Sequence, residues 1–172
     1  MSKLITEAAQ WTPDQLTDLL RAQGTLPQGR VIAVQAETSE TQQAQIGHLT
    51  LAYSLDAPPD VPRRLFSKLS RHDRGYPGYA AFAGSEVMFY TVFAPAIDTP
   101  PLVRCYAAHY DPLSRRSHLL LEDIAETHAA PRFPDEWPLP PAYTQMEQIV
   151  DALVQCQAVC WDHPQLGDLP GG

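Results

Sequence analysis

The first element that the hydrophobic pattern predicts is a short amphipathic helix near the start of the chain. Leucines recur at helical spacing from Leu16 to Leu20 and would form one apolar face. They follow Thr12, a good capping residue, and Pro13, which suits the first turn of a helix. Gly24 is a common helix stop. We therefore predict a helix between Thr12 and Gly24.

Five stretches with strand character follow, with partial alternation of apolar and polar positions. A polar tip at Ser39–Gln45 joins the first two, and the turn-forming Asp111–Ser114 joins the last two. Hairpin connections favour antiparallel pairing, because parallel pairing needs a crossover between neighbouring strands. The stretches are Val31–Thr38, Ile46–Leu55, Arg64–Leu69, Leu102–Tyr110 and Ser117–Ile124.

Two further helices complete the expected set of elements. Apolar residues repeat at mostly helical spacing from Ala81 to Phe93, and a second apolar stripe follows a proline-rich linker at 129–141. The expected class is α+β, a five-stranded antiparallel sheet with a helix packed on it, and the expected parts are 1–128, 129–141 and a helical segment at 142–172. The second stripe consists of Met146, Ile149, Val150, Leu153, Val154 and Trp161.

Charge and composition narrow the class of partner. The chain of 172 residues has a formal net charge of −8 and a pI near 5.1, whereas nucleic acids and anionic membranes attract basic surfaces. No apolar run approaches the roughly 18 residues of a membrane span, and Glu7 interrupts the segment that is apolar in a signal peptide. We expect a cytoplasmic protein that binds neither nucleic acid nor membrane.

A lysine embedded in a predicted strand is the first candidate for chemistry. Lys68 lies between Phe66 and Leu69, and an ammonium among apolar neighbours must either reach water or meet an anion. Glu86 on the following helix is a suitable partner if that helix packs over the sheet. On spacing alone, a purely structural or surface role for Lys68 is an equal alternative.

The last predicted strand ends abruptly in two acids. Its apolar residues lead directly into Glu122, Asp123 and Ile124. A strand that runs out of a sheet offers backbone N–H and C=O groups, and the edge of a purine base can pair with such groups. The segment from Glu122 to Ile124 is therefore a candidate contact for a base.

Taken in order, these motifs resemble the aminoglycoside phosphotransferase superfamily and, within it, the ecdysteroid-kinase-like (CHK kinase-like) branch. The resemblance covers nearly the whole chain and implies the N-terminal, protein-kinase-like lobe of an ATP-dependent kinase for small hydroxylated molecules. The matching segments are Gly47–Tyr53, Arg64–Leu69, Ser85–Tyr90, Pro101–Tyr106, His118–Asp123 and Trp161–Pro164.

The resemblance also implies roles for individual residues. Lys68 would face the α and β phosphates of ATP, Glu86 would pair with Lys68, and the backbone near Glu122 and Ile124 would face adenine, with magnesium as the accompanying cation. The polar tip at Ser39–Gln45 would cover the phosphates. That tip has no Gly-x-Gly-x-x-Gly motif. Glu40 within it and Glu37 just before it are unfavourable near a triphosphate unless they turn outward.

Two other groups of residues resemble functional motifs but are better explained by structural roles. His109-Tyr110-Asp111 has the H-x-D form of a kinase catalytic loop, but it precedes a predicted strand, and Asp-Pro favours a hairpin turn. Cys156, Cys160 and His163 share a helix face and offer three zinc ligands, but buried cysteines on an apolar face are commoner. The other histidines, His48, His72, His118 and His128, lack a partner pattern and are expected at the surface or half-buried. Cys105, Cys156 and Cys160 are too few for a disulfide framework and are expected to be reduced.

Two functional hypotheses remain open at this point. The first is a nucleotide-binding lobe that transfers no phosphate by itself, because the chain has no asparagine to serve as the usual amide ligand for magnesium. The second is a non-catalytic module that binds a partner or associates with itself. For either, we expect an exposed apolar patch around the last helix and the strand that ends at Ile124, and homodimerisation through it.

Overall fold

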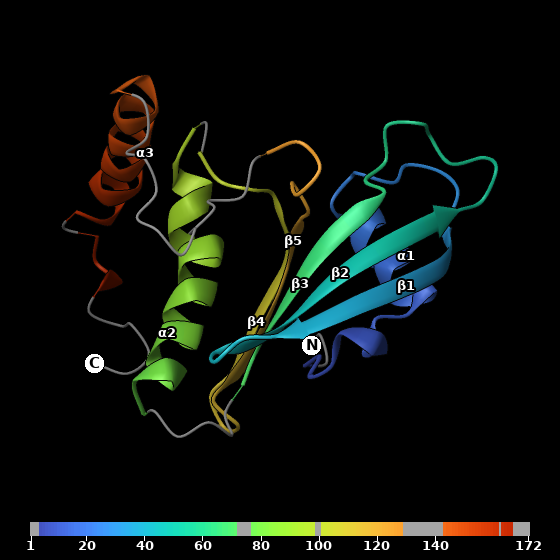
Figure 1. Cartoon of the computed structure of the whole chain (residues 1–172), viewed down its shortest axis with the longest axis horizontal. Coiled ribbons are helices and arrows are strands. Elements are labelled where there is room, and N and C mark those ends of the chain that lie inside the picture. The colour runs from blue at the N-terminus through green and yellow to red at the C-terminus, as the bar shows by residue number, and fades with distance from the viewer. Residues whose placement is uncertain (1–3, 72–76, 99–100, 129–142, 162, 167–172) are drawn as a thin grey trace, which may run out of the picture.

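The computed structural model describes residues 4–71, 77–98, 101–128, 143–161 and 163–166, and the side chains of 77–81 are not part of that description. The α+β class and the five-stranded antiparallel sheet are confirmed, with strands in the order β1-β2-β3-β5-β4. Three α-helices accompany the sheet in the described part of the chain (Figure 1). The proline-rich linker at 129–141 lies outside the described residues.

The strands pair as the two predicted hairpins require. β1 (Val31–Glu40) pairs with β2 (Ala44–Tyr53), and β4 (Cys105–Asp111) pairs with β5 (Arg116–Glu122). β3 (Arg64–Ser70) lies between the hairpins and pairs with β2 on one side and β5 on the other. β3 and β5 are therefore inner strands, each paired with a neighbour along both edges.

Helix α1 (Pro13–Ala22) begins and ends at the predicted signals. The Thr12 side chain accepts the Gln15 N–H, and the Gln15 side chain accepts the Thr12 N–H, which is a complete capping box. After the helix, Gly24 takes a φ of +69°, a left-handed conformation that glycine adopts without steric cost. Local sequence alone accounts for this element.

The N-terminal segment and α1 cover most of one face of the sheet. Leu65 and Leu69 of β3 and Leu120 of β5 are buried there against Leu16 and Leu20 of α1. A short 3-10 turn, η1 (Ala8–Gln10), packs against β1, β2 and β3 on the same face. We call this side of the sheet the closed face.

Two buried polar contacts fix the N-terminal segment on the closed face. The Trp11 indole Nε1–H donates to the Ser67 hydroxyl at 3.0 Å, and the backbone N–H of Ile5 donates to His118 Nδ1 at 3.0 Å. The Trp11 and His118 rings meet edge to face, with centroids 5.5 Å apart. His118 is only 1% exposed, so the expectation of a surface or half-buried position for this histidine is wrong.

Gly47 of β2 allows η1 to approach the sheet closely. A Cβ atom built at Gly47 would lie 2.4 Å from the Cβ of Ala8, which is far inside van der Waals contact. Ala8 itself is fully buried and its N–H donates to the Gln45 side chain. The close packing of this turn therefore depends on the missing side chain at position 47.

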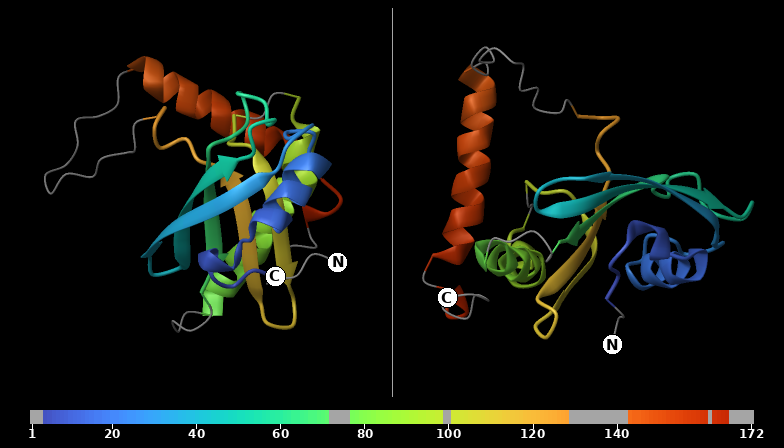
Figure 2. Two further views of the ribbon diagram at one scale, coloured as in Figure 1. Left: turned by 90° about the vertical axis from the view of Figure 1, so that its right-hand side faces the viewer. Right: turned by 60° about the horizontal axis from the view of Figure 1, so that its bottom comes forward.

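Helix α2 (Pro77–Met88) packs on the other side of the sheet, which we call the open face, as Figure 2 shows. It continues into a π-helical turn, η2 (Phe89–Phe93), and a 3-10 turn, η3 (Ala94–Ala96). Val87 joins Leu119 and Leu121 of β5 in a smaller core, with Phe66 and Tyr90 packed at its edge. The helix begins earlier than the predicted Ala81, because Pro77 suits a first helical turn.

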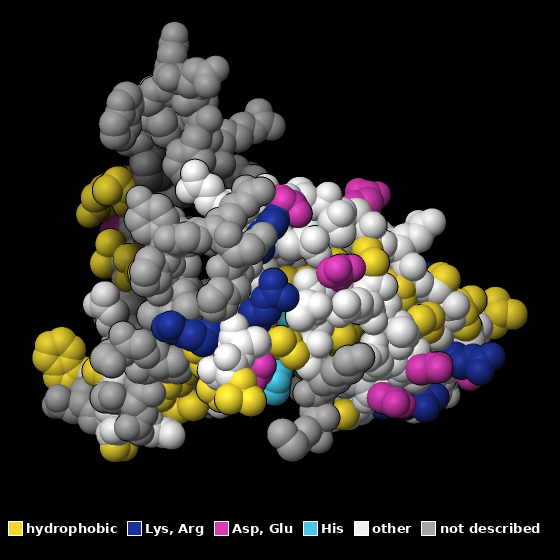
Figure 3. Space-filling model, turned by 90° about the horizontal axis from the view of Figure 1, so that it is seen from below, with side chains coloured by type: hydrophobic (Ala, Val, Ile, Leu, Met, Phe, Trp, Pro, Cys, Tyr) yellow, Lys and Arg dark blue, Asp and Glu magenta, His cyan; other side chains and the backbone are white. Residues whose placement is uncertain are grey.

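Helix α3 (Tyr143–Cys160) stands apart from the rest of the protein and packs mainly against η2. Apolar side chains line the edge of the molecule on the side of α2 and α3 (Figure 3). None of the residues in α3 is buried. The apolar side chains of the predicted stripe, each about half exposed or more, are Met146, Ile149, Val150, Leu153, Val154 and the following Trp161.

Three expectations about element boundaries and the apolar patch need correction. Leu102–Arg104 is irregular, because the Arg104 side chain reaches the Gln23 carbonyl at 3.0 Å and the strand starts only at Cys105. β5 ends at Glu122 and not at Ile124, because the Ile124 carbonyl accepts N–H groups from a following turn. Ile124 is half-buried, so the end of this strand does not contribute to the exposed apolar patch.

Candidate functional site

The alternation of β3 places Lys68 on the open face of the sheet. Leu65, Ser67 and Leu69 are buried toward α1, so the residues between them point to the opposite side. In the sheet register, Lys68 lies between Ile46 of β2 and Leu119 of β5. The lysine thus sits in the middle of the sheet on the side that α2 covers only in part.

Glu86 of α2 meets Lys68 in a two-point contact. The Lys68 Nζ atom lies 2.7 Å from Oε1 and 2.8 Å from Oε2 of Glu86, which confirms Glu86 as the partner expected from the sequence. Both side chains are 34% exposed. An ammonium has three N–H donors, and among the described residues Glu86 is the only partner of Lys68. One donor of Lys68 therefore remains available to a ligand.

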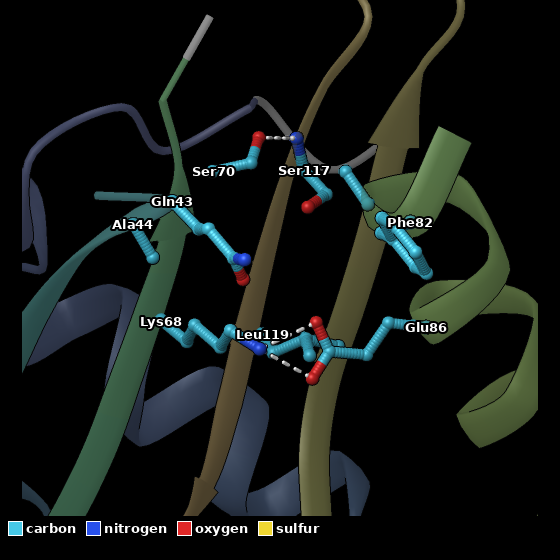
Figure 4. Close-up of a pocket in the computed structure, with 9 residues that line it drawn as sticks. Gln43, Ala44, Lys68, Ser70, Phe82, Glu86, Ser117 and Leu119 are labelled. Carbon is cyan, nitrogen blue, oxygen red and sulfur yellow. Dashed lines mark hydrogen bonds and ion pairs between the residues drawn. The ribbon is translucent and has the colours of Figure 1, made fainter. Parts of the chain in front are cut away.

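A small pocket of about 50 Å³ adjoins the ion pair (Figure 4). That volume accommodates water molecules but not a nucleoside. A larger ligand must therefore lie over the open face and extend only part of itself into the pocket. Besides Lys68 and Glu86, the lining includes Gln43, Ala44, Ser70, Phe82, Ser117 and Leu119.

Glu122 and Ile124 lie at the far end of β5 from this pocket. Glu122 pairs in register with Leu65, three residues before Lys68 on β3, so the two levels are separated by about 10 Å. The Glu122 N–H donates to the Arg104 carbonyl at 2.8 Å, and the Ile124 carbonyl accepts the N–H groups of Thr127 and His128. These two backbone groups are already hydrogen-bonded.

A charged cluster that the sequence reasoning did not find ties this end of β5 to the neighbouring strands. Asp123 Oδ2 lies 2.7 Å from His48 Nδ1 and 3.4 Å from Arg64 Nε, and Arg64 Nη1 lies 2.8 Å from Glu126 Oε1. The Asp123 side chain is only 2% exposed. These contacts join β2, β3 and the segment after β5 across 75 residues of sequence.

The cluster keeps the buried carboxyl of Asp123 ionised. Burial acts to raise the pKa of Asp123, but hydrogen bonds from His48 and the Ala125 N–H, together with the charges of His48 and Arg64, lower it overall. In the sequence, the only local sign that Asp123 has a special role is its position directly after an apolar strand. The partners His48 and Arg64 could not be paired with it without the strand order.

The two alternative constellations lie outside this site. His109 and Asp111 belong to β4, and Asp111 accepts the N–H groups of Leu113 and Ser114, which confirms the predicted hairpin turn. Cys156 and Cys160 are partly exposed on α3, and His163 packs edge-on against the Phe93 ring. Within the described residues, no group of three or more potential metal ligands comes together.

The acids of the first hairpin lie on different faces of the sheet. Glu40 pairs with Arg71, next to Leu69 and Thr6 on the closed face. Glu37 is opposite His48 in the register and so lies on the open face, on the edge strand β1. Glu40 therefore turns away from Lys68, as a triphosphate at Lys68 would require, whereas Glu37 lies on the same face of the sheet as Lys68.

No protein-family model matches the sequence, and no curated protein or solved structure matches it significantly. Among the helices of the described residues, none is long and apolar enough to cross a membrane.

Proposed function

We propose that the open face binds a nucleoside triphosphate, in the manner of the N-terminal lobe of an aminoglycoside phosphotransferase-type kinase. The observation that carries the proposal is the two-point Lys68–Glu86 contact, made between a central strand and a packed helix beside a small open pocket. Glu86 fixes the direction of the ammonium. Lys68 then presents its remaining donor and its charge to the α and β phosphates.

The remaining part of the open face suits the base. A nucleotide lying along β3, with its phosphates at Lys68, would extend its base toward the segment from Glu122 to Ile124. Between these ends, the His48 and Phe66 rings meet edge to face with centroids 5.4 Å apart. Aromatic side chains offer a flat apolar surface to a purine. Because the Glu122 N–H and the Ile124 carbonyl are both occupied, the remaining backbone groups of this segment would contact the base.

Magnesium would arrive with the nucleotide. Magnesium in nucleotide sites is held mainly by phosphate oxygens, water and one or two carboxylates, and not by an all-protein cage. The described residues contain no cluster of three or more carboxylate, thiol or imidazole ligands, and the Glu86 carboxylate is engaged by Lys68. Magnesium would therefore be bound through the phosphate oxygens and water, and not by a site that these residues form without the nucleotide.

The proposed function is binding without phosphoryl transfer by these 172 residues. The sequence contains no asparagine, and its H-x-D motif at His109–Asp111 lies in a hairpin. Phosphoryl transfer needs a carboxylate that orients the acceptor hydroxyl and ligands that fix the cation. Incubation with ATP, magnesium and aminoglycosides, sugars or sterols should give no turnover above that of a Lys68→Met variant. Turnover that this substitution abolishes would contradict the statement.

Calorimetric titration with ATP and magnesium tests the binding itself. We expect saturable binding by the parent chain, and stabilisation by about 2.7 kcal/mol when ATP is at 100 times its Kd. Lys68→Met should abolish both effects, whereas Lys3→Met, at the only other lysine of the chain, should leave both unchanged. Absence of binding at millimolar ATP, or equal binding by the Lys68→Met variant, would refute the proposal.

A second candidate function is self-association through α3, and the exposed apolar stripe of that helix favours it. Met146, Val150 and Leu153 follow the three- and four-residue spacing of a helix–helix seam. The helix carries no lysine or arginine, so pairing two copies buries no basic side chain. The occupant that fits this stripe is a second copy of the same helix.

Sedimentation analysis over a range of protein concentrations tests this second function. The parent chain should form a dimer at high micromolar concentration, and Leu153→Asp should shift it to monomer. Leu113→Asp, at an exposed apolar residue in the β4–β5 turn, is the matched control and should dimerise as the parent does. A parent chain that stays monomeric throughout would exclude self-association.

A further inference from the structure

The turn between β1 and β2 satisfies most of its own backbone amides. The Thr41 hydroxyl accepts the N–H groups of Gln43 at 3.3 Å and Ala44 at 3.0 Å, and the Thr41 N–H donates to the Ala44 carbonyl at 2.9 Å. A loop that cradles phosphate with its backbone needs free N–H groups and is usually rich in glycine. This turn has no glycine, and the N–H groups of Thr41, Gln43 and Ala44 are occupied, so its backbone is a poor phosphate ligand.

The side chain of Gln43 points from this turn into the pocket beside Lys68. Figure 4 shows the Gln43 amide directed toward the Lys68–Glu86 pair, from the opposite side of the pocket to Phe82. Its backbone is anchored at both ends, because its N–H is held by Thr41 and its carbonyl accepts the Arg71 N–H at 3.0 Å. Within the described residues, the Gln43 side-chain amide makes no hydrogen bond.

We propose that the Gln43 side-chain amide is the phosphate ligand of the β1–β2 turn and acts together with Lys68 on the same phosphate group. This inference rests on the proposed nucleotide-binding function. The amide supplies two N–H donors and no charge, whereas Lys68 supplies the charge. The pair thereby replaces the backbone cradle that the turn does not offer, and it distinguishes nucleotides that carry a β phosphate from nucleosides.

The surrounding charges are consistent with a phosphate at this point. Glu40, three residues before Gln43, is held by Arg71 on the closed face. The Glu86 carboxylate is compensated by Lys68. Ser70 and Ser117 line the same pocket, with the Ser70 hydroxyl accepting the Ser117 N–H at 2.7 Å. No uncompensated carboxylate lines this pocket among the residues described for it.

Calorimetric titrations with magnesium ATP and with adenosine test the assignment. Gln43→Ala should weaken ATP binding about ten-fold, the effect of losing a hydrogen bond to a charged group, and should leave adenosine binding unchanged. Gln43→Glu should weaken ATP binding further, because it adds a carboxylate beside the phosphates. Gln42→Ala is the matched control, since Gln42 is an exposed neighbour outside the pocket lining, and should bind ATP as the parent chain does.

The outcomes separate this inference from the function on which it rests. If the parent chain binds ATP and Gln43→Ala binds it equally well, the Gln43 assignment is wrong and the Lys68 site stands. If Gln43→Ala loses adenosine and ATP affinity to the same extent, the residue does not act on phosphate, and the assignment is also wrong. If the parent chain binds no ATP, both proposals fail together.

Discussion

The two faces of the sheet treat polar side chains in different ways. On the closed face, Trp11, Ser67 and His118 are buried, and the indole, hydroxyl and imidazole groups are joined by hydrogen bonds to each other or to the N-terminal backbone. On the open face, Lys68 and Glu86 are one-third exposed and adjoin a pocket. The same central strand, β3, supplies Ser67 to one face and Lys68 to the other.

This difference separates structural from functional polar groups. A buried polar side chain whose hydrogen bonds are satisfied inside the protein has no capacity left for a ligand, and its removal costs stability. A partly exposed ion pair contributes little to stability, because water screens it. Substitutions on the closed face should therefore affect folding, whereas substitutions on the open face should affect ligand binding.

The largest expected effect on stability is that of Trp11→Ala. The Trp11 side chain is 7% exposed and packs in the main core, so its truncation should lower the free energy of unfolding by about 3–5 kcal/mol. Urea denaturation followed by circular dichroism measures the change. Trp11→Phe is a useful comparison, because it keeps an aromatic ring but leaves Ser67 without its indole donor. A loss below 1 kcal/mol for Trp11→Ala would contradict the tight packing of Trp11 against the closed face of the sheet.

The second prediction concerns the pH dependence of stability. Burial, together with nearby His109, lowers the pKa of His118 from 6.5 to about 4. In the unfolded chain the imidazole takes up a proton below pH 6.5, but in the folded protein it does so only near pH 4. The free energy of unfolding should therefore keep its full value above pH 6.5 and decrease as the pH drops toward 4, by up to about 3 kcal/mol. Urea denaturation at several pH values measures this slope.

His118→Gln provides the control for the pH experiment. Glutamine does not titrate in this range, so the variant should be less stable at neutral pH and should lose much of the slope between pH 6.5 and 4. A variant that keeps the full slope would assign the pH dependence to other groups.

Gly47→Ala should have an intermediate effect on the closed face. The added methyl group would overlap Ala8 of η1, and overpacking of this kind costs about 1–3 kcal/mol. Gly24→Ala is the comparison, because a Cβ atom there meets nothing within 4 Å and only the positive φ is strained. Thermal denaturation should rank Gly47→Ala as the less stable variant, and a Gly47→Ala protein as stable as the parent would contradict the close packing of η1.

The sequence predicted those helices, strands and contacts that depend on residues close together in the chain. The capping box and Gly24 define α1, and the run Arg64–Leu69 predicts β3 with Lys68 among apolar neighbours. Glu86 could be paired with Lys68 because the predicted helix follows β3 directly and packs over it. In each case, the information lies within a short span of sequence.

The contacts that sequence reasoning missed are long-range. Ile5 and His118 are 113 residues apart, and His48 and Asp123 are 75 residues apart. Their pairing depends on the strand order and on the path of the N-terminal segment under the sheet, which no local pattern specifies. For the same reason, the sequence could not predict that the Gln43 side chain points toward Lys68, because this depends on how the β1–β2 turn lies relative to β3.

The smallest expected effect on stability is that of the Lys68–Glu86 pair. Lys68→Met and Glu86→Gln should each change the free energy of unfolding by less than about 1 kcal/mol, because both side chains are partly exposed. Chemical denaturation of both variants measures this. A loss of 3 kcal/mol or more would indicate that the pair is a structural element, like the polar contacts of the closed face, and would remove the argument for a ligand.

The most direct test of the nucleotide site is labelling with a lysine-reactive acyl phosphate of ATP, read out by peptide mass spectrometry. Lys68 and Lys3 are the only lysines of the chain, so the position of the label identifies the site without further substitutions. We predict that the label is found on Lys68 in preference to Lys3, and that excess magnesium ATP suppresses it while adenosine at the same concentration does not. Equal labelling of the two lysines, unaffected by ATP, would contradict a nucleotide site at Lys68.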